Sequence, residues 1–269
     1  MTPQMSKIGP IVLLTDFGLR DCYAGSMKGV ILGIFPEARL VDLSHEIEPQ
    51  NVLQAAFVLE AAYPYFPRSS IFVNVVDPGV GSERRILAAK THSGIFLAPD
   101  NGLLSGVLAK TEKYEMRSVT NRRFFAKKIS QTFHGRDCFA PASAQLAKNE
   151  SLFNDLGPVV SDYKKLIRPS PRIERGKMKG EVLFFDHFGN AFTNIETRHL
   201  KKNLSTNCQV WVGRRNLGPI RNSYFEGQKG DAMALMSSSD ILEIAVNQGS
   251  ARSVLHLKKG TPIEVYFEK

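Results

Sequence analysis

The stretch Ile71-Phe72-Val73-Asn74-Val75-Val76 is rich in β-branched residues and stops abruptly at Asp77-Pro78-Gly79. A short apolar run bounded by turn-forming residues is typical of a buried β-strand. Two earlier runs, Ile11 to Leu14 and Leu40 to Leu43, have the same character, and the first ends at Thr15-Asp16-Phe17-Gly18. The sequence therefore predicts three strands, the first of them buried, with polar residues directly after the first and the third.

Helical periodicity separates these strands. Apolar residues recur at helical spacing from Tyr23 to Ile34, before Pro36, and from Val52 to Tyr63, before Pro64. Strands that alternate with helices are typical of right-handed βαβ crossovers and a mainly parallel sheet. The polar residues after the strands are then expected at the carboxyl edge, where open α/β sheets bind ligands.

The second half of the chain has a different pattern. The first half continues with predicted strands at 86–91 and 94–98 and predicted helices at 103–110 and after 139–141. The second half contains short strand-like runs separated by Gly, Asn and Ser, at 182–185, 210–212, 232–236, 242–246 and 263–267. These runs predict a small β-rich barrel or sandwich. The length of 269 residues suits roughly two domains. A proline- and lysine-rich stretch marks the boundary, so we expect an N-terminal α/β catalytic domain (8–166), a linker (167–178) and a smaller C-terminal domain (179–269).

Composition excludes several classes of protein. Apolar residues make up 43% and charged residues 23%, as in an ordinary globular protein. The net charge of +9 would suit an anionic partner, but the basic residues are dispersed, which argues against nucleic-acid binding. No apolar run is long enough to span a membrane, and we expect no membrane association. Three distant cysteines, Cys22, Cys138 and Cys208, predict a reducing, cytoplasmic location.

Two strand-end loops place a carboxylate beside glycine. Asp16 precedes Gly18, and Asp77 precedes Gly79 and Gly81. Either loop could be a turn whose aspartate caps the next helix, or a ligand-binding loop at the sheet edge. A Gly-x-Gly without a third glycine is a poor dinucleotide motif, and no P-loop is present.

The segment Phe133-His134-Gly135-Arg136-Asp137 combines three ionisable residue types at one turn. A lone histidine is often structural, but burying three ionisable groups together without a function is costly. The segment is not a kinase catalytic loop, because glycine interrupts it and no Asp-Phe-Gly follows. The six histidines show no metal-ligand spacing, so no metal is expected.

The second half has its own polar segments. Asp186-His187-Phe188-Gly189-Asn190 follows a predicted strand, and Asn190 could contact a base edge or simply lie in a hairpin turn. Tyr224 and Phe225 could stack on a planar ligand, although aromatic residues of small β domains are more often core. Ala98-Pro99-Asp100-Asn101-Gly102 has the composition of a turn.

With these motifs in order, the chain resembles the S-adenosyl-L-methionine (SAM) hydroxide adenosyltransferases, or adenosine-forming SAM hydrolases, which are relatives of the fluorinase and chlorinase. The resemblance extends from Ile11 to about Phe267. Six segments carry it: Thr15 to Gly18, Asp77 to Arg85, Pro99 to Gly102, Thr132 to Asp137, Asp186 to Asn190, and Leu242 to Ala251.

The resemblance implies a seven-stranded α/β N-terminal domain, a C-terminal antiparallel β-barrel, and a homotrimer with active sites between subunits. It implies that water or hydroxide attacks C5′ of SAM, releasing L-methionine and adenosine, so that SAM is the substrate and no cofactor is needed. The implied catalytic triad is Asp77, Arg84 and His134. The implied binding residues are Asp16 for the ribose, Asp186 for the methionine amine and Asn190 for the adenine, with Ser238, Glu243 and Val246 assigned more loosely to the methionine and adenine contacts.

One departure separates this chain from the halide-using relatives. They have a Tyr-Ser pair where this chain has His134-Gly135. An imidazole beside a guanidinium suits an oxygen nucleophile, which argues against a halogenase. The alternative to an enzyme is a protein that binds or senses SAM or adenosine without converting it.

Overall fold

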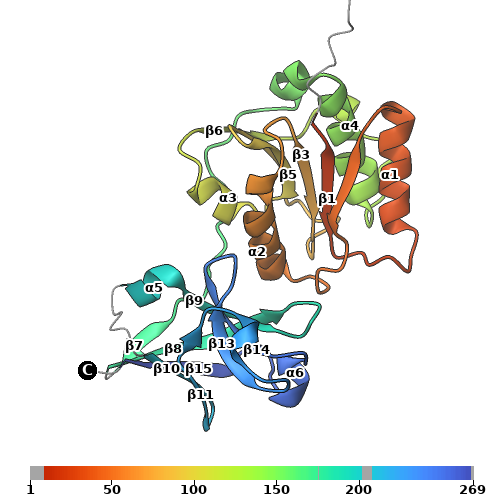
Figure 1. The fold of residues 1–269 in the computed structure, drawn as a ribbon. Coiled ribbons are helices and arrows are strands. Elements are labelled where there is room, and N and C mark those ends of the chain that lie inside the picture. The colour runs from red at the N-terminus through yellow and green to blue at the C-terminus, as the bar shows by residue number, and fades with distance from the viewer. Residues whose placement is uncertain (1–8, 175, 202–207, 268–269) are drawn as a thin grey trace, which may run out of the picture. The chain divides into compact units, whose positions relative to one another are not determined.

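The computed structural model describes residues 9–174, 176–201 and 208–267. The chain divides into two compact units, Met1–Leu166 and Ile167–Lys269, which are described separately (Figure 1).

The N-terminal unit is built on a six-stranded sheet with the order β2-β1-β3-β5-β4-β6. Its first four strands in this order run parallel, and β4 is antiparallel to both β5 and β6. The predicted mainly parallel sheet is confirmed. The seventh strand that the family resemblance implied is absent from the described residues, because Val159 forms only an isolated bridge with Arg117 of β6. The strands are β1 (Ile11–Thr15), β2 (Leu40–Ser44), β3 (Ile71–Val75), β4 (Ile86–Thr91), β5 (Gly94–Pro99) and β6 (Tyr114–Ser118).

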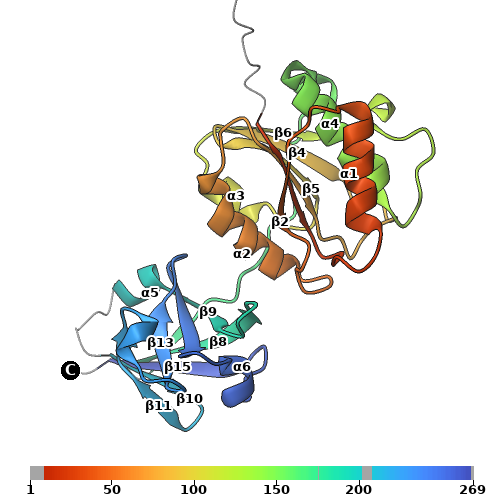
Figure 2. The ribbon, with the colours of Figure 1, turned by 45° about the vertical axis from the view of Figure 1, so that its right-hand side comes forward.

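Helices cover both faces of this sheet. Helices α1 (Tyr23–Ile34) and α4 (Ala140–Lys148) lie on one face, and α2 (Val52–Ala62) and α3 (Ser105–Ala109) lie on the other (Figure 2). Alternate residues of a strand point to opposite faces, so Leu13 packs with α1 and α4, whereas its neighbours Val12 and Leu14 pack with α2 and α3. A π-helical turn (Gly135–Phe139) leads into α4, and the short 3₁₀ turns are η1 (Tyr63–Tyr65), η2 (Arg122–Phe124) and η4 (Glu150–Asp155).

The C-terminal unit is a curled, mostly antiparallel sheet with the order β11-β10-β15-β8-β9-β14-β13-β12. β11 also approaches β13 near the far end of this order, so the sheet nearly closes. The predicted barrel is thereby confirmed, and the sandwich is not. The elements are β7 (Arg172–Glu174), β8 (Lys177–Phe185), β9 (Ala191–Glu196), α5 (Thr197–Lys201), β10 (Cys208–Val212), β11 (Arg215–Gly218), β12 (Ile220–Arg221), η5 (Tyr224–Glu226), β13 (Ala232–Met236), β14 (Ile241–Val246), α6 (Ala251–Val254) and β15 (Pro262–Phe267).

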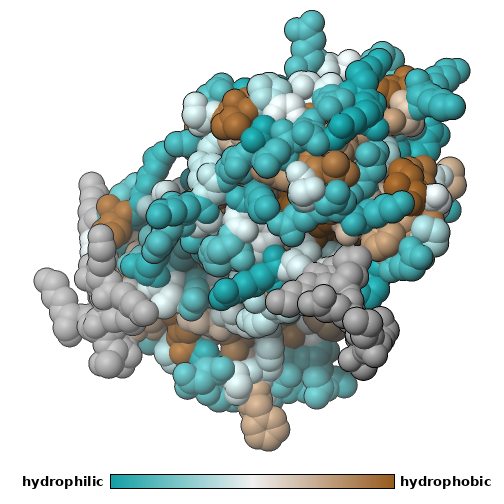
Figure 3. Space-filling model, turned by 90° about the horizontal axis from the view of Figure 1, so that it is seen from above, coloured by the Kyte–Doolittle hydropathy of each residue, from teal (hydrophilic) through white to brown (hydrophobic). Residues whose placement is uncertain are grey.

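The apolar residues that alternate along these strands fill the barrel. Val182, Val210, Ile244 and Val265 are all fully or almost fully buried in one cluster. The predicted linker region 167–178 contains β7 and the first residues of β8. None of the helices described is long and apolar enough to cross a membrane. The face seen in Figure 3 is mainly hydrophilic, with small, separate hydrophobic patches.

Candidate active site

Two carboxylates lie side by side at the carboxyl edge of the N-terminal sheet. Strands β1 and β3 are parallel neighbours, with Thr15 opposite Val75. Asp16 directly follows β1, and Asp77 follows β3 by two residues. The strand order therefore brings these two predicted site residues together.

The loop after β1 holds Asp16 in a half-buried position. The backbone N–H of Gln50 donates to Asp16 Oδ2 over 2.7 Å. Burial raises the pKa of the Asp16 carboxyl, the hydrogen bond from Gln50 opposes this effect, and the nearby Asp77 charge adds to it. The parallel pairing of β1 with β3 places both carboxylates at the same edge of the sheet.

Asp77 and Arg84 form a buried ion pair. Arg84 Nε donates to Asp77 Oδ2 over 2.7 Å, and Arg84 Nη2 contacts the same oxygen. The two side chains are only 5% and 6% exposed, respectively. The other carboxylate oxygen accepts from the Gly79 N–H at 3.2 Å. The carboxylate therefore fixes the guanidinium while being fixed by its own loop.

His134 completes a continuous chain with this pair. Arg84 Nη2 lies 2.9 Å from His134 Nδ1. Because a guanidinium can only donate, Nδ1 must accept, and the neutral ring then carries its proton on Nε2. Burial and the Arg84 charge lower the pKa of His134, with partial opposition from Asp77 and Asp137. The structure thus brings all three predicted catalytic residues together around a neutral imidazole.

Glycine allows the Asp77 loop to approach the His134 loop. Gly81 has φ of 81°, and a Cβ there would lie 2.4 Å from the Gln131 carbonyl oxygen. No other residue tolerates both this backbone conformation and this approach. Within the loop, Ser82 Oγ donates to the Gly79 carbonyl at 2.7 Å and accepts from the Arg84 N–H at 3.3 Å. These contacts place Arg84 between Asp77 and His134.

Asp137 holds the other side of the triad. It is buried and accepts from the Ser130 N–H at 2.8 Å and from Arg136 Nε at 2.6 Å. The pKa of Asp137 is lowered, because these hydrogen bonds outweigh burial, which alone would raise it. Arg136 also lies over the Phe133 ring. Asp137 and Arg136 therefore shape the loop that carries His134, while Arg84 hydrogen-bonds the imidazole.

In the C-terminal unit, Asp186 and Asn190 are the two ends of the β8–β9 hairpin turn. Asn190 donates its backbone N–H to Asp186 Oδ1 at 2.8 Å and its side-chain amide to Asp186 Oδ2 at 3.1 Å. Asn190 is thus a hairpin residue, and its Oδ1 keeps the capacity to accept. Gly189 makes the turn possible with φ of 82°, and a Cβ there would overlap Ser250 Oγ.

Glu243 lies beside this turn in β14. It is 3% exposed, and Tyr224 donates its hydroxyl to Glu243 Oε1 over 2.5 Å. Burial raises the pKa of Glu243, the tyrosine opposes this, and Asp186 adds to the rise. The side chains that hydrogen-bond these two carboxylates, Asn190 and Tyr224, are both neutral. The predicted residues Asp186, Asn190 and Glu243 thus form one acidic cluster.

Two predicted residues occupy opposite ends of the same hairpin. Ser238 is exposed in the turn between β13 and β14, whereas Val246 is buried at the end of β14. Of the six residues of β14, five lie between them, at about 3.3 Å per residue. Val246 lies on the same strand as Glu243, and the structure does not bring Ser238 to Val246.

Two polar networks were not predicted. Asp100 is buried, binds Arg85 through Nε at 2.9 Å, and accepts the Lys164 N–H at 2.8 Å, so it anchors a structural turn. His45, after β2, is also buried and hydrogen-bonds Thr15, the residue before Asp16. The available signal was its position after a predicted parallel strand.

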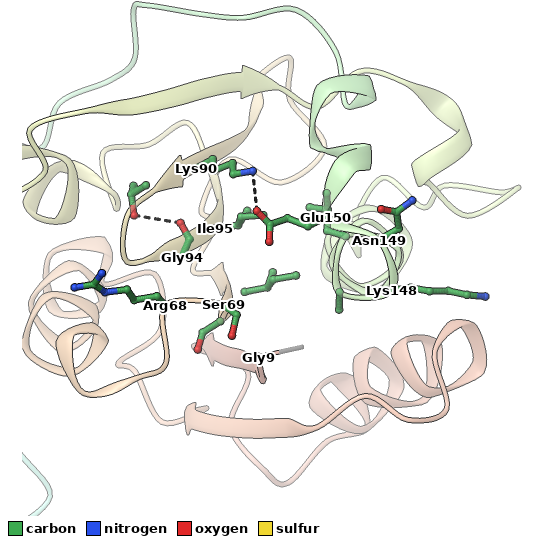
Figure 4. Close-up of a pocket in the computed structure, with 14 residues that line it drawn as sticks. Gly9, Arg68, Ser69, Lys90, Gly94, Ile95, Lys148, Asn149 and Glu150 are labelled. Atoms are coloured by element: carbon green, nitrogen blue, oxygen red, sulfur yellow. Dashed lines mark hydrogen bonds and ion pairs between the residues drawn. The ribbon is translucent and has the colours of Figure 1, made fainter. Parts of the chain in front are cut away.

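A pocket of about 270 Å³ lies at the opposite edge of the N-terminal sheet (Figure 4). It lies near the starts of β3 and β5 and the end of α4, and none of the predicted site residues lines it. Lys90 pairs with Glu150 across it, while Arg68 and Lys148 extend outward on opposite sides. Among the described residues, no three His, Cys, Asp or Glu side chains are grouped to hold a metal ion.

Comparison with known proteins finds one family along nearly the whole chain. Residues 11–157 match the SAM hydroxide adenosyltransferase N-terminal domain, and residues 180–264 match the C-terminal domain of the same family. The chain is similar to an (R)-S-adenosyl-L-methionine hydrolase of Thermus thermophilus, with 38% identity over 95% of this chain and 99% of the relative. A hydrolase of the same name from Methanocaldococcus jannaschii is 33% identical over 96% of this chain and 95% of its own.

The chain is also similar to a halogenating enzyme and to a solved structure. A fluorinase of an Actinoplanes species is 26% identical over 95% of this chain and 96% of its own. The crystal structure of an uncharacterized conserved protein from Thermotoga maritima matches with a TM-score of 0.86 and 39% identity, over 95% of this chain and 99% of that one. The similarity therefore holds in both sequence and fold over nearly the whole chain.

Proposed function

Because the chain belongs to the SAM hydroxide adenosyltransferase family, we propose that it hydrolyses S-adenosyl-L-methionine to adenosine and L-methionine. The observation that supports this reaction best is the chain from Asp77 through Arg84 to a neutral His134. It offers a fixed hydrogen-bond donor and a buried cation at the carboxyl edge of the sheet, both suited to an oxygen nucleophile.

The reaction requires little help with its leaving group. The oxygen of water forms a bond to C5′ while the C5′–S bond breaks. The electron pair of the C5′–S bond stays on sulfur and neutralises the sulfonium. One proton of the water passes to solvent. The sulfur needs neither a proton nor a metal ion, so the difficulty lies in orienting and activating a weak nucleophile.

The triad is proposed to perform that task. His134 accepts from Arg84 at Nδ1, so its Nε2–H is available to donate to the nucleophilic oxygen and direct a lone pair at C5′. The positive charge of Arg84 favours the negative form of that oxygen. Asp77 keeps the guanidinium in place. In this arrangement His134 positions the nucleophile and is not a general base, because its Nδ1 lone pair is already occupied.

The remaining predicted residues are proposed to bind the substrate. The carboxylate of Asp16 would accept from the ribose hydroxyls. Asp186 would face the methionine ammonium, and Glu243 adds negative charge beside it. Asn190 Oδ1 would accept from the adenine amine, and Val246 and Ser238 would contribute adenine and methionine contacts.

Incubation of the purified protein with SAM, followed by chromatography, tests the reaction. Adenosine and methionine should appear in equal amounts, and added chloride or fluoride should give no halogenated nucleoside. The His134→Ala protein, prepared identically, controls for contaminating hydrolases. Recovery of intact SAM bound to the protein, without adenosine, would instead identify a binding or sensing protein.

We also propose that the protein is a homotrimer whose sites combine the N-terminal unit of one subunit with the C-terminal unit of the next. The assigned residues support this, since catalytic groups lie in one unit and Asp186 and Glu243 in the other. At SAM concentrations far below KM, coexpressing the Asp77→Ala and Asp186→Ala chains in equal amounts would then restore about a quarter of the sites to wild-type activity, whereas sites within single subunits would show only the residual activity of Asp186→Ala.

Two further assignments accompany the proposal. We take 8–166 as the catalytic domain, 167–178 as the linker and 179–269 as the barrel domain, of which residues 8, 175, 202–207 and 268–269 lie outside the described structure. Cys22, Cys138 and Cys208 are not joined by disulfides, which supports a reducing compartment, the cytoplasm.

A further inference from the structure

A buried histidine links the edge strand β2 to the loop that carries Asp16. His45 is 2% exposed, and its Nδ1 lies 2.8 Å from Thr15 Oγ1. Its Nε2 lies 3.1 Å from Asp42 Oδ1, and Asp42 Oδ2 accepts from Lys28 Nζ at 2.6 Å. Four side chains from β1, α1, β2 and the loop after β2 therefore form one continuous chain.

The hydrogen bonds of this chain have a defined direction. The Phe17 N–H donates to Thr15 Oγ1 at 3.2 Å, so the threonine hydroxyl has its own proton left to donate. The Asp42 carboxylate can only accept, so His45 Nε2 carries a proton, and in the neutral ring Nδ1 then accepts from the Thr15 hydroxyl. Nε2–H then donates to the Asp42 carboxylate. This neutral tautomer pairs both ring nitrogens and leaves no donor facing another donor.

The outer end of the chain is anchored electrostatically. Burial would raise the pKa of Asp42, but the hydrogen bonds from Lys28 and His45 and the positive charge of Lys28 outweigh it and lower the pKa. Asp42 therefore stays an acceptor throughout the neutral pH range. Its side chain is 40% exposed, so the anchor lies at the surface while the histidine lies inside.

The backbone at and after His45 also hydrogen-bonds the loop that carries Asp16. The Gly18 N–H donates to the His45 carbonyl at 2.7 Å, and the Gln50 N–H donates to Asp16 Oδ2 at 2.7 Å. Gln50 adopts φ of 64°, a conformation uncommon for a residue other than glycine. Side-chain and backbone contacts of 45–50 thus reach Thr15, Asp16 and Gly18, and Phe17 is held through Thr15.

We propose that His45 is a positioning residue for substrate binding: through Thr15 and Phe17 it fixes the orientation of the Asp16 carboxylate toward the ribose. This rests on the proposed role of Asp16. His45 touches no substrate in this arrangement. Its loss should therefore weaken nucleoside binding, while the geometry of Asp77, Arg84 and His134 and the rate of the chemical step stay nearly unchanged.

Thr15→Val is the central variant, because valine keeps the shape of threonine in a buried strand and removes only the hydroxyl. We expect the Kd for adenosine, measured by calorimetry, and the KM for SAM to rise about tenfold, with kcat changed less than about threefold. His45→Gln should behave similarly. Thr15→Ser, which retains the hydroxyl, should restore both constants to within about twofold of the wild type.

A matched control separates positioning from general loss of a buried hydroxyl. Thr111 is also buried in the N-terminal unit, and its hydroxyl donates to the Val107 carbonyl at 2.8 Å. Thr111→Val should lower the melting temperature as Thr15→Val does but leave adenosine binding unchanged. Equal effects of both variants on Kd would overturn the proposal.

A double-mutant cycle identifies the residue through which His45 acts. Asp16→Ala alone should weaken adenosine binding, and adding Thr15→Val to it should change Kd by less than about twofold. If Asp16→Ala leaves binding unaltered, the proposed role of Asp16 fails. If Asp16→Ala weakens binding but Thr15→Val adds its full effect in both backgrounds, the role of Asp16 stands and the inference about His45 fails.

Nuclear magnetic resonance of protein labelled with ¹⁵N-histidine tests the hydrogen-bond direction without any ligand. The His45 signals, assigned by their loss in His45→Gln, should show a neutral ring protonated at Nε2. A ring protonated at Nδ1 would contradict the chain described here, because that proton would face Thr15 Oγ1 and leave Nε2 without a donor for Asp42.

Discussion

The two polar clusters of this protein balance charge in opposite ways. In the N-terminal unit, Asp77 is paired with Arg84, and the guanidinium in turn contacts a neutral His134. In the C-terminal unit, Asp186 is bound by the amide of Asn190, and Glu243 accepts from the neutral hydroxyl of Tyr224. The first cluster is internally neutralised, whereas the second keeps two carboxylates without a cation among the described residues.

This difference matches the two ends of the proposed substrate. A neutralised cluster can hold a neutral or anionic oxygen without repelling it. A carboxylate whose pKa is raised, as burial and the Asp186 charge do for Glu243, gains stability when a cation arrives. The first cluster should therefore control the rate of the chemical step, and the second should control affinity for the positively charged substrate.

The largest expected effect is on turnover. Asp77→Ala, Arg84→Ala and His134→Ala should each reduce kcat for SAM by ~100-fold or more, because each removes part of the chain that orients the nucleophile. His134→Ala is the most informative, because it leaves the buried Asp77–Arg84 ion pair intact and should stay folded, as judged by circular dichroism.

Arg123→Ala is the matched control for these variants. Arg123 also pairs with an aspartate, Asp155, but both side chains are about half exposed. Surface pairs of this kind contribute about 0–1 kcal/mol to stability, so turnover should be unchanged. Wild-type kcat in His134→Ala would remove the histidine from the mechanism.

The second effect compares glycines of the two units. Gly81→Ala should lower the free energy of unfolding by about 2 kcal/mol and also reduce kcat, because the methyl group would push the Arg84 loop away from Gln131. Gly213→Ala has a similar positive φ of 58° but no atom within 4 Å of the added Cβ. It should cost about 1 kcal/mol of backbone strain and leave kcat intact, as urea titration and kinetics would show.

Sequence periodicity predicted the part of the site that depends on strand order. Asp16 and Asp77 follow buried strands, and neighbouring parallel strands end at one edge, so their proximity followed from the pattern. Their neighbour His134 lies beyond a long irregular segment after β6, where no periodicity relates it to Arg84. Only the family resemblance placed it in the triad.

Other features escaped prediction because they depend on single side-chain contacts. His45 follows a half-exposed edge strand, and its position after a predicted strand, the available signal, does not indicate that the histidine is buried. Tyr224 was expected to stack on a ligand or to lie in the core, yet its hydroxyl contacts Glu243, 19 positions away. The strand count differed because residues around Val159 form one bridge and no ladder.

The third effect concerns the charge of the C-terminal cluster. Asp186→Asn keeps a group that can accept from Asn190 but removes the negative charge. The KM for SAM should rise about tenfold, while the Kd for neutral adenosine should change less than about twofold, since charge-assisted contacts contribute about 1.5–3 kcal/mol. Calorimetry with adenosine and kinetics with SAM separate the two. Equal weakening of both ligands would show that Asp186 acts only through the hairpin fold.

The smallest effect is the pH dependence of the N-terminal cluster. Burial and Arg84 lower the pKa of His134 from its ordinary value near 6.5, so the neutral, active form persists below that pH. More than half of the sites should then be active at pH 6.5, and kcat/KM should fall less than about twofold between pH 7.5 and 6.5. A decline of about tenfold in kcat/KM between pH 7.5 and 6.5 would mean that ionisation of the nucleophile, and not protonation of His134, governs the rate. A midpoint above 6.5 that disappears in His134→Gln would show instead that Asp77 and Asp137 dominate the imidazole, and that the N-terminal cluster is not neutralised as described.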